Sequence, residues 1–402
     1  MKPNFLLLLL AATLNIILLN IAANAQPFAI GKTSITFTDA ARNGRSIPTD
    51  IYYPAQQAGT NTSVVAGTQK FPVISIGHGF VMSVDAYANL WNMLVPEGYI
   101  VALPRTETSL APSHENFGKD LAFVIDAITL LNQNSSSLFF NRIDSMNCVM
   151  GHSMGGGAAH LAAAGSNNIK SVATLAAAET NPSAIAAAGN TTIPALVFAG
   201  ANDCVTPPAN HQLPIYNALK SACKTYISIN GASHCQMAES NFNCNFGEST
   251  CSPGPAISRA DQHAVIKSYL IPWLNYQLKK DCNQARIFDN LMKTDTKITY
   301  LNQCSFCLIN NTSSNSLAAG INIYPNPFSH SLTISGKMNT QIPAYLRIES
   351  IDGKVYISKY ITTSELNTPS FQVNTTSLPP GFYILRLINK KEQNTFKIYK
   401  AQ

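Results

Sequence analysis

The chain has 402 residues, 46% of them hydrophobic, and a formal net charge of +6, and this length fits two domains better than one. The charge does not indicate nucleic-acid binding, because nine basic and four acidic residues from position 321 onward account for +5 of it and are scattered rather than clustered with aromatic residues. A membrane protein with several spans is also excluded, since no stretch after the amino-terminal segment approaches the ~20 apolar residues of a membrane span.

Residues 1–25 are predicted to be a secretory signal peptide. Lys2 precedes the apolar core "FLLLLLAATLNIILL", and the small residues of "ANA" at 23–25 form a cleavage site, so the mature chain is expected to begin near Gln26. An uncleaved membrane anchor is the alternative. The expected location is outside the cell or on its surface, with no transmembrane segment once the signal is removed.

Residues 26–308 alternate apolar strands with helical segments. The stretch "SITFTDAARNGRSIPTDIYYP" predicts an antiparallel hairpin that turns near Asn43 and Gly44. Short apolar strands follow, among them "FPVISIG", "YIVALP" and "MNCVMG". They alternate with helices such as "GKDLAFVIDAITLLNQ" and "RADQHAVIKSYLIPWLNYQL", the last of which is expected to break at Pro272. This alternation predicts the α/β class, with a mostly parallel, doubly wound sheet covered on both faces.

The remainder of the chain differs in pattern. Residues 309–322 are small, polar and without a period, which indicates a linker. Residues 323–402 contain no convincing helix, and "AYLRIESIDGKVYISKYI" predicts two strands around a turn at Asp352 and Gly353. Together with "FYILRLI" and "TFKIYK", these strands predict a small antiparallel β-sandwich.

The stretch "VMGHSMGGGAAH" carries the strongest chemical signal. Gly151 to Gly155 fit the pattern G-x-S-x-G between a predicted strand and a predicted helix, which is the context of a nucleophile elbow that exposes the Ser153 hydroxyl. The Met154 amide would then face an oxyanion at the helix N-terminus, and the loop "SIGHGF" would add the Phe80 amide. A structural glycine-rich turn is the alternative.

A serine nucleophile needs a base, which a carboxylate orients, and in this type of fold the acid and then the histidine follow the serine. Asp203 is the expected acid, because "ANDCVTPP" follows the strand "PALVFAG". His234 is the expected base, because "NGASH" follows the strand "KTYISI". Three other histidines are considered and set aside: His160, His211 and His263. Four residues are expected to line the substrate cleft: Gly79, His152, Glu179 and Thr180.

Nine cysteines in an exported chain indicate disulfides, and an odd number leaves at least one free. Cys148 lies in the apolar run "NCVMG" and is the expected free thiol. The candidates for bridges include Cys204, Cys235, Cys244, Cys251, Cys282, Cys304 and Cys307. A Cys204–Cys235 bridge would tie the acid loop to the base loop, but Cys235 is alternatively paired with Cys223 or Cys244. Two further pairings are open: Cys244 with Cys251, and Cys282 with Cys304 or Cys307.

Together, "VMGHSMGGGAAH", "GANDCVTPP" and "INGASH" resemble the α/β-hydrolase branch that contains bacterial cutinases, polyester hydrolases and dienelactone-hydrolase-like esterases, over about residues 30–280. The resemblance implies an eight-stranded α/β-hydrolase sheet, ester hydrolysis through an acyl-enzyme, and no metal or cofactor. It places nucleophile, acid and base on Ser153, Asp203 and His234. It places the oxyanion amides on Phe80 and Met154. Some polyester hydrolases also have a bridge between the acid and base loops.

One stretch departs from that family. Polyester hydrolases carry a tryptophan wall after the strand that follows the elbow, whereas "AAAETNPS" places Glu179 and Thr180 there. The only tryptophans, Trp91 and Trp273, lie elsewhere. The connection between "SVATLAA" and "PALVFAG" is too short for a lid domain, so an uncapped site open to bulky or polymeric esters is expected.

The tail resembles a second module. The stretches "INIYPNPFSHSLTIS", "IDGKVYI", "LPPGFYILRL" and "FKIYK" are similar to a type IX secretion C-terminal sorting domain. The resemblance implies the export machinery as a partner, and a carbohydrate-binding sandwich is the alternative.

The sequence therefore predicts a secreted serine ester hydrolase, cutinase-like or polyesterase-like, with PET among the candidate polymers. The expected partners are an ester substrate and the type IX machinery, and no nucleic acid. The alternatives are a small-ester or lipid esterase similar to dienelactone hydrolase or platelet-activating-factor acetylhydrolase, a serine peptidase or acyltransferase with the same triad, and a non-catalytic adhesin.

Overall fold

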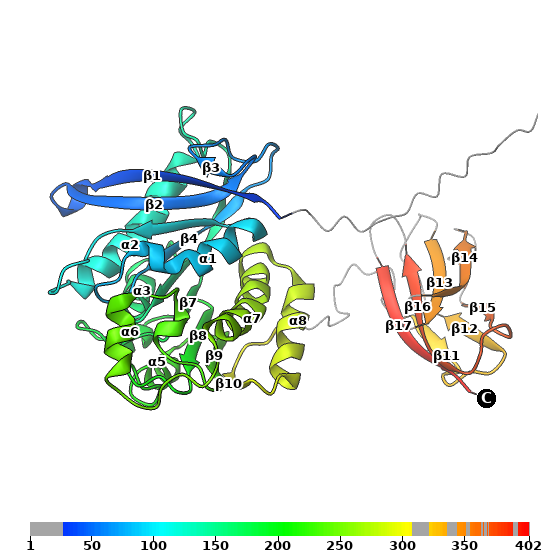
Figure 1. The fold of residues 1–402 in the computed structure, drawn as a ribbon. Helices are drawn as coiled ribbons and strands as arrows, with labels where there is room; N and C mark the ends of the chain where they lie inside the picture. Colours follow the sequence, from blue (N-terminus) through cyan, green and yellow to red (C-terminus); the bar gives the residue numbers. More distant parts are fainter. Residues whose placement is uncertain are drawn as a thin grey trace, which may run out of the picture. The chain divides into compact units, whose positions relative to one another are not determined.

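The computed structural model describes residues 27–307, 321–335, 344–350, 354–362, 365, 368, 370–388 and 393–401. The chain divides into two compact units, with the boundary between Phe306 and Cys307, and each unit is described by itself (Figure 1). The predicted signal peptide and residues 309–320 of the predicted linker lie outside the described residues. No helix within the described part of the chain is long and apolar enough to cross a membrane.

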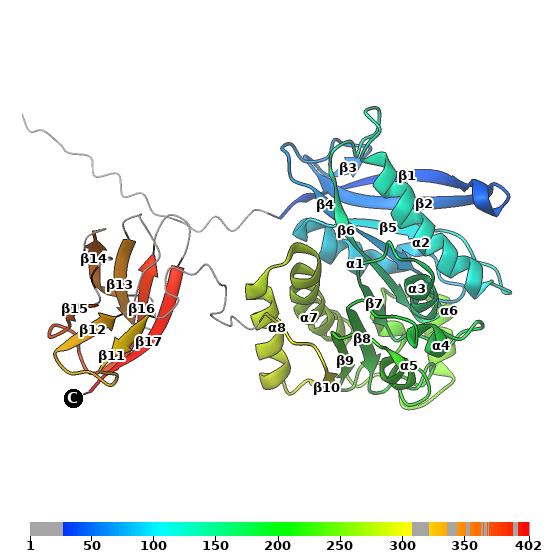
Figure 2. The same cartoon turned by 180° about the vertical axis from the view of Figure 1, so that it is seen from behind.

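A ten-stranded sheet forms the centre of the first unit, in the order β10-β9-β8-β7-β6-β4-β5-β2-β1-β3 (Figures 1 and 2). The strands are β1 (Ala29–Asp39), β2 (Arg45–Ala55), β3 (Gly59–Thr60), β4 (Phe71–Gly77), β5 (Ile100–Pro104), β6 (Ile143–His152), β7 (Val172–Leu175), β8 (Ala195–Gly200), β9 (Lys224–Ile229) and β10 (Ile298–Asn302). All neighbours from β5 to β9 are parallel. The predicted mostly parallel sheet is thus confirmed.

The hairpin turn of this sheet agrees with the prediction, and its number of strands does not. The hairpin of β1 and β2 reverses at Asn43 and Gly44, whose φ angles of 57° and 70° give the left-handed backbone that such a turn needs. The expected number of eight strands was too low. The structure adds the two-residue β3 and also β10, which pairs antiparallel with β9 at the opposite edge.

Helices cover both faces of the sheet, as Figures 1 and 2 show from opposite sides. They are α1 (Ala88–Leu94), α2 (His114–Leu131), α3 (Met154–Gly165), α4 (Ala184–Ala188), α5 (Gln212–Ala218), α6 (Phe242–Ser249), α7 (Arg259–Lys279) and α8 (Cys282–Thr294). One core lies between the sheet and α1, α7 and α8, with Trp273 fully buried in it. The other lies between the sheet and α2, α3, α4 and α5, and includes Leu121 and Ile215.

Helix α7 corrects one prediction, because it continues through Pro272 instead of breaking there. A proline inside a helix costs about 3 kcal/mol. Tyr269 and Trp273, on the same helix, are fully buried, and burying two large aromatic side chains releases a free energy of at least similar size. Packing against the sheet therefore outweighs the local signal for a helix end.

The second unit contains two antiparallel sheets, of order β11-β12-β15 and β14-β13-β16-β17. The strands are β11 (Asn322–Tyr324), β12 (Ser331–Ser335), β13 (Ala344–Ser350), β14 (Val355–Ile361), β15 (Ser370–Asn374), β16 (Gly381–Ile388) and β17 (Gln393–Lys400). Leu332 and Val373 of the first sheet share one buried cluster with Leu346 and Leu385 of the second. The predicted small antiparallel sandwich is thus confirmed.

Candidate active site

Ser153 lies at a sharp turn between β6 and α3. Its φ of 55° and ψ of −121° place a residue with a side chain in a region that costs conformational energy. The surrounding backbone holds it there: the Ser153 amide donates to the Leu175 carbonyl at 3.1 Å, and the Ser153 carbonyl accepts from the amides of Gly157 at 3.1 Å and Ala178 at 2.9 Å. The strand–turn–helix context predicted for the elbow is therefore present.

The glycines around this turn permit a close approach of backbones. A Cβ atom at Gly155 would lie 2.2 Å from the carbonyl carbon of Gly77 in β4, and one at Gly151 would lie 2.1 Å from the Gly155 carbonyl oxygen. Neither distance is compatible with a side chain. The first turn of α3 can pack against the strands only because these positions lack one, and this packing holds Ser153 at the carboxyl edge of the sheet.

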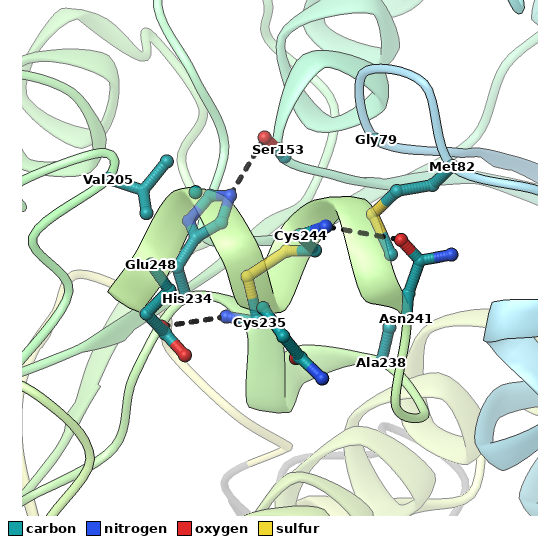
Figure 3. Close-up of a disulfide and its surroundings, with 12 residues drawn as sticks. Gly79, Met82, Ser153, Val205, His234, Cys235, Ala238, Asn241, Cys244 and Glu248 are labelled. Atoms are coloured by element: carbon teal, nitrogen blue, oxygen red, sulfur yellow. Dashed lines mark hydrogen bonds between the residues drawn. A yellow bond between two sulfur atoms is a disulfide. The ribbon is translucent and has the colours of Figure 1, made fainter. Parts of the chain in front are cut away.

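Three side chains from separate loops meet at this edge. His234 Nε2 lies 2.9 Å from Ser153 Oγ, and His234 Nδ1 lies 2.8 Å from Asp203 Oδ2. The loop after β8 carries Asp203 and the loop after β9 carries His234, and both side chains are buried. Figure 3 shows the imidazole directed at the serine hydroxyl. This chain of contacts can move a proton from the hydroxyl to the imidazole.

Thr206 is a member of the site that the sequence analysis missed. Its hydroxyl donates to Asp203 Oδ2 at 2.8 Å and lies 3.0 Å from His234 Nδ1. Its amide donates to Asp203 Oδ1 at 2.7 Å, and Gln212 Nε2 donates to its hydroxyl oxygen at 3.1 Å. The available signal was a threonine three residues after the acid, in position to bond back to it.

The loop after β4 is fixed by buried polar side chains. The ring nitrogens of His78 lie 2.9 Å and 2.8 Å from the carbonyl oxygens of Gly79 and Thr106, so His78 orders this loop. The Gly79 amide donates to the Tyr87 hydroxyl at 2.6 Å. At the surface end of this loop Phe80 is exposed, whereas Met154 is buried at the start of α3. The role of these two amides as oxyanion donors stays a prediction.

His152 does not line an open cleft, contrary to the prediction, because it is fully buried. Its Nδ1 lies 3.0 Å from the Tyr87 hydroxyl and its Nε2 lies 3.2 Å from the His234 carbonyl oxygen. Burial, with a smaller contribution from neighbouring His234, lowers the pKa of His152 well below its ordinary value. A neutral His152 therefore connects the loop after β4, through Tyr87, to the loop that carries His234. Gly79 is buried as well.

Glu179 and Thr180 make local contacts in the loop between β7 and α4. The Glu179 carboxylate accepts from the Ile185 amide at 3.0 Å, and its own amide donates to His211 Nδ1 at 2.9 Å. The Thr180 hydroxyl donates to the Pro182 carbonyl at 2.7 Å. Both residues are partly exposed, and their contact with substrate stays a prediction. The other histidines lie apart from Ser153: His160 is buried in α3, His211 precedes α5, and His263 is on α7.

The disulfides differ from the predicted Cys204–Cys235 pairing. Cys204 bonds Cys251 and Cys235 bonds Cys244. The alternative pairing of Cys235 with Cys244 is thus confirmed, whereas Cys235 with Cys223 and Cys244 with Cys251 were wrong. The reason is helix α6, which the sequence analysis did not anticipate. It carries Cys244, whose bridge to Cys235 after the base is drawn in Figure 3, and it ends just before Cys251, whose bridge reaches Cys204 after the acid.

The other cysteines complete the pattern. Cys223 bonds Cys304, which excludes Cys304 as a partner of Cys282. Cys282 and Cys307 are disulfide-bonded as well. Cys148 is free, as predicted, and its complete burial in β6 raises the pKa of its thiol to about 12.

Both backbone polar groups of Cys235, the residue after His234, are held by hydrogen bonds. The buried Glu248 carboxylate of α6 accepts from the Cys235 amide at 3.0 Å, and Arg259 donates to the Cys235 carbonyl at 2.6 Å and to the Ala238 carbonyl. These contacts fix the backbone that carries the imidazole. They come from segments far along the chain, which no local pattern could have indicated.

Two parts of the chain match known protein families. Residues 19–252 match the model of a family described as PET hydrolase-like, and residues 322–401 match a secretion system C-terminal sorting domain. The chain is 27% identical to Cutinase 1 of Thermobifida cellulosilytica over 214 residues, which cover 53% of this chain and 73% of that protein.

Two further relatives are similar. The chain is 27% identical to a cutinase of Thermobifida fusca (strain YX), over 53% of this chain and 64% of the relative. It is 30% identical to a bis(hydroxyethyl) terephthalate hydrolase of Streptomyces coelicolor, over 55% of this chain and 65% of the relative. The chain thus spans about two thirds of the length of each of these two relatives.

Proposed function

Because the chain belongs to the PET hydrolase-like family, and is therefore a carboxylic ester hydrolase, we propose that Ser153 is its nucleophile, His234 its general base and Asp203 the acid that orients the base. The observation that carries this assignment is the unbroken chain of contacts from Ser153 Oγ through the imidazole to the Asp203 carboxylate, at 2.9 and 2.8 Å.

The reaction follows from these contacts. His234 Nε2 takes the proton as Ser153 Oγ attacks the ester carbonyl carbon, and Asp203 stabilises the imidazolium that forms. The negative charge on the carbonyl oxygen is received by the amides of Phe80 and Met154. The imidazolium then protonates the leaving alcohol, which leaves an acyl group on Ser153. A water molecule, deprotonated by His234, attacks this acyl-enzyme, and the imidazolium returns the proton to Ser153 Oγ as the acid is released.

The proposed substrates are bulky or polymeric esters. Between β7 and β8 the chain forms only the five-residue helix α4, which is too short to close over Ser153. The names of the relatives, cutinase and bis(hydroxyethyl) terephthalate hydrolase, point to polyesters and their fragments. The sorting domain makes this a secreted or cell-surface protein, and such a location gives an enzyme access to polymers that cannot enter a cell.

The sorting domain also bears on how the chain is organised. We propose a signal peptide at 1–25, a catalytic domain at 26–308, a linker at 309–322 and a sorting domain at 323–402, with the last recognised by the type IX export machinery. The match of residues 322–401 to a sorting domain and the separate buried core of this unit support the division.

The test is the variant Ser153→Ala. We expect kcat on p-nitrophenyl butyrate to fall about 10⁴-fold or more, because the nucleophile is lost while the oxyanion donors remain. A fluorophosphonate probe should label the wild type and leave the variant unlabelled. Hydrolysis that persists at the wild-type rate in the variant, after identical purification, would contradict the assignment.

A panel of substrates separates the alternatives. We expect turnover of p-nitrophenyl esters from acetate to palmitate and of a polyester film, and none of peptide amides. Cleavage of peptides at a comparable kcat/KM would favour a peptidase instead, and covalent labelling of Ser153 excludes a non-catalytic adhesin.

A further inference from the structure

Helix α6 is attached to all three loops of the proposed active site. Cys244 bonds Cys235, which follows the base, and Cys251 at its end bonds Cys204, which follows the acid. Asn243 Nδ2 donates to the Val81 carbonyl, one residue after Phe80, at 2.9 Å. The helix is therefore held rigidly at the rim of the site, as its position below Ser153 and beside Met82 in Figure 3 illustrates.

This helix exposes two phenylalanines on one face. Phe242 and Phe246 are four residues apart, one helical turn, and their side chains are 82% and 64% exposed. Their rings lie 6.3 Å apart between centroids and are inclined by only 17°. Leaving a phenylalanine in water instead of burying it forgoes about 1.5–3 kcal/mol. Two such rings side by side are typical of a surface that another molecule covers.

The charge of the helix restricts what that molecule can be. Among the eight residues of α6 the only acidic or basic side chain is that of Glu248, and it is buried against the Cys235 amide. The exposed face of α6 therefore offers apolar rings and neutral polar groups. Such a face suits an uncharged apolar chain, and it lacks the basic residues that a nucleic acid or an anionic lipid surface requires.

We propose that Phe242 and Phe246 form an adsorption platform for polyester, which holds an apolar segment of the polymer beside Ser153 while another segment is cleaved. This inference rests on the proposed function. Two further apolar side chains are exposed on the loops that follow β4 and β8, namely Phe80 and Val205. A polymer can lie across α6 and these loops, whereas a second copy of the chain docked on α6 would lie against the loops that must admit the substrate, because α6 is bonded to them.

The experiment measures adsorption separately from catalysis. Ser153→Ala protein, which cannot erode the film, is equilibrated with amorphous PET and with polycaprolactone, and bound protein is measured against free concentration. Adding Phe242→Ser and Phe246→Ser should lower the association constant at least five-fold on both films.

The matched control is Leu130→Ser with Phe140→Ser. These residues are 66% and 40% exposed. Leu130 lies in the last turn of α2 and Phe140 in the loop before β6, at the amino edge of the parallel strands and away from Ser153. This variant removes exposed apolar surface without touching α6, so it should adsorb like the parent. With Ser153 intact, the ratio of film hydrolysis to p-nitrophenyl butyrate hydrolysis should fall at least five-fold for the α6 variant and stay constant for the control.

Three results would overturn the platform. The first is equal adsorption of the α6 variant and the control. The single variants Phe242→Ser and Phe246→Ser are made in case the double variant does not fold, and the second result is that both adsorb like the parent. A parent that is dimeric by light scattering while the α6 variant is monomeric would assign the rings to a second copy. A wild-type chain that hydrolyses no ester would instead contradict the proposed function, and the adsorption measurement would still decide on the platform.

Discussion

The hydroxyl of Thr206 is shared between the proposed acid and the proposed base. It donates to Asp203 Oδ2 at 2.8 Å and lies 3.0 Å from His234 Nδ1, so it fixes the relative orientation of carboxylate and imidazole and acts through them. It is therefore a positioning residue. A hydrogen bond to a charged group contributes about 1.5–3 kcal/mol, of which only the part that differs between ground and transition state affects the rate.

Replacement of this threonine should consequently change turnover more than binding. For Thr206→Val we expect kcat on p-nitrophenyl butyrate to fall about ten-fold, corresponding to about 1.4 kcal/mol, with KM nearly constant. Thr206→Ser keeps the hydroxyl and should restore most of kcat. A rise in KM at constant kcat, or a serine variant as slow as the valine variant, would show that the methyl group and its packing matter instead.

Local patterns located some residues of the site and could not locate others. Ser153, Asp203 and His234 were predictable because each follows a recognisable apolar strand, and parallel strands place their carboxyl ends at one edge of the sheet. Tyr87, Gln212 and Glu248 were missed because no sequence motif marks their hydrogen bonds, which depend on how the loops fold together. His152 was predicted to line the cleft because it directly precedes Ser153, but its side chain is fully buried.

Helix α6 is the element that the sequence concealed most completely. Its residues "FNCNFGES" lack the apolar spacing of a helix that packs on a sheet, because two bridges rather than a buried stripe hold it in place. Without α6, the cysteines beside the acid and the base seemed able to bond each other. A break of the last long helix at Pro272 was predicted for a similar reason, because the sequence does not show which side chains pack against the sheet. Buried neighbours keep α7 continuous there.

The two bridges of α6 should differ in their effect on stability. Cys204 and Cys251 are separated by 47 residues, and Cys235 and Cys244 by 9. Loop-closure entropy then gives about 4 kcal/mol for the first bridge and about 2.5 kcal/mol for the second. We expect Cys204→Ser with Cys251→Ser to lower the free energy of unfolding more than Cys235→Ser with Cys244→Ser, measured by urea unfolding. Equal losses would show that local contacts, not chain entropy, set the contribution.

At the scale of the whole molecule, each of the two units has its own buried core, so each is expected to have its own pH dependence of unfolding. In the catalytic unit, His160 of α3 is fully buried and neither ring nitrogen has a hydrogen-bond partner among the described residues. Burial lowers the pKa of His160 to about 4. The folded state therefore binds this proton less readily than the unfolded chain does.

The sign of the effect follows directly. Above the unfolded pKa of about 6.5, neutral His160 makes its full contribution to the free energy of unfolding. As the pH falls towards 4, the folded protein loses roughly 3 kcal/mol of this stability. For His160→Gln, urea unfolding of the catalytic unit between pH 7.5 and 4.5 should show a shallower decline in stability than the wild type. Identical slopes in the two proteins would mean that other groups, among them buried His152, dominate the acid sensitivity.

The single free cysteine has a consequence for how the chain matures. A thiol exchanges with disulfides only as a thiolate, and Cys148 is buried in the central strand β6 with a pKa raised to about 12. Once this strand has formed, the ninth thiol is withdrawn from exchange, and the other eight cysteines can settle into their pairs without a competitor. Scrambled bridges should therefore arise only when oxidation precedes the assembly of the sheet, which makes the order of these two events the determinant of the yield of correctly bridged protein.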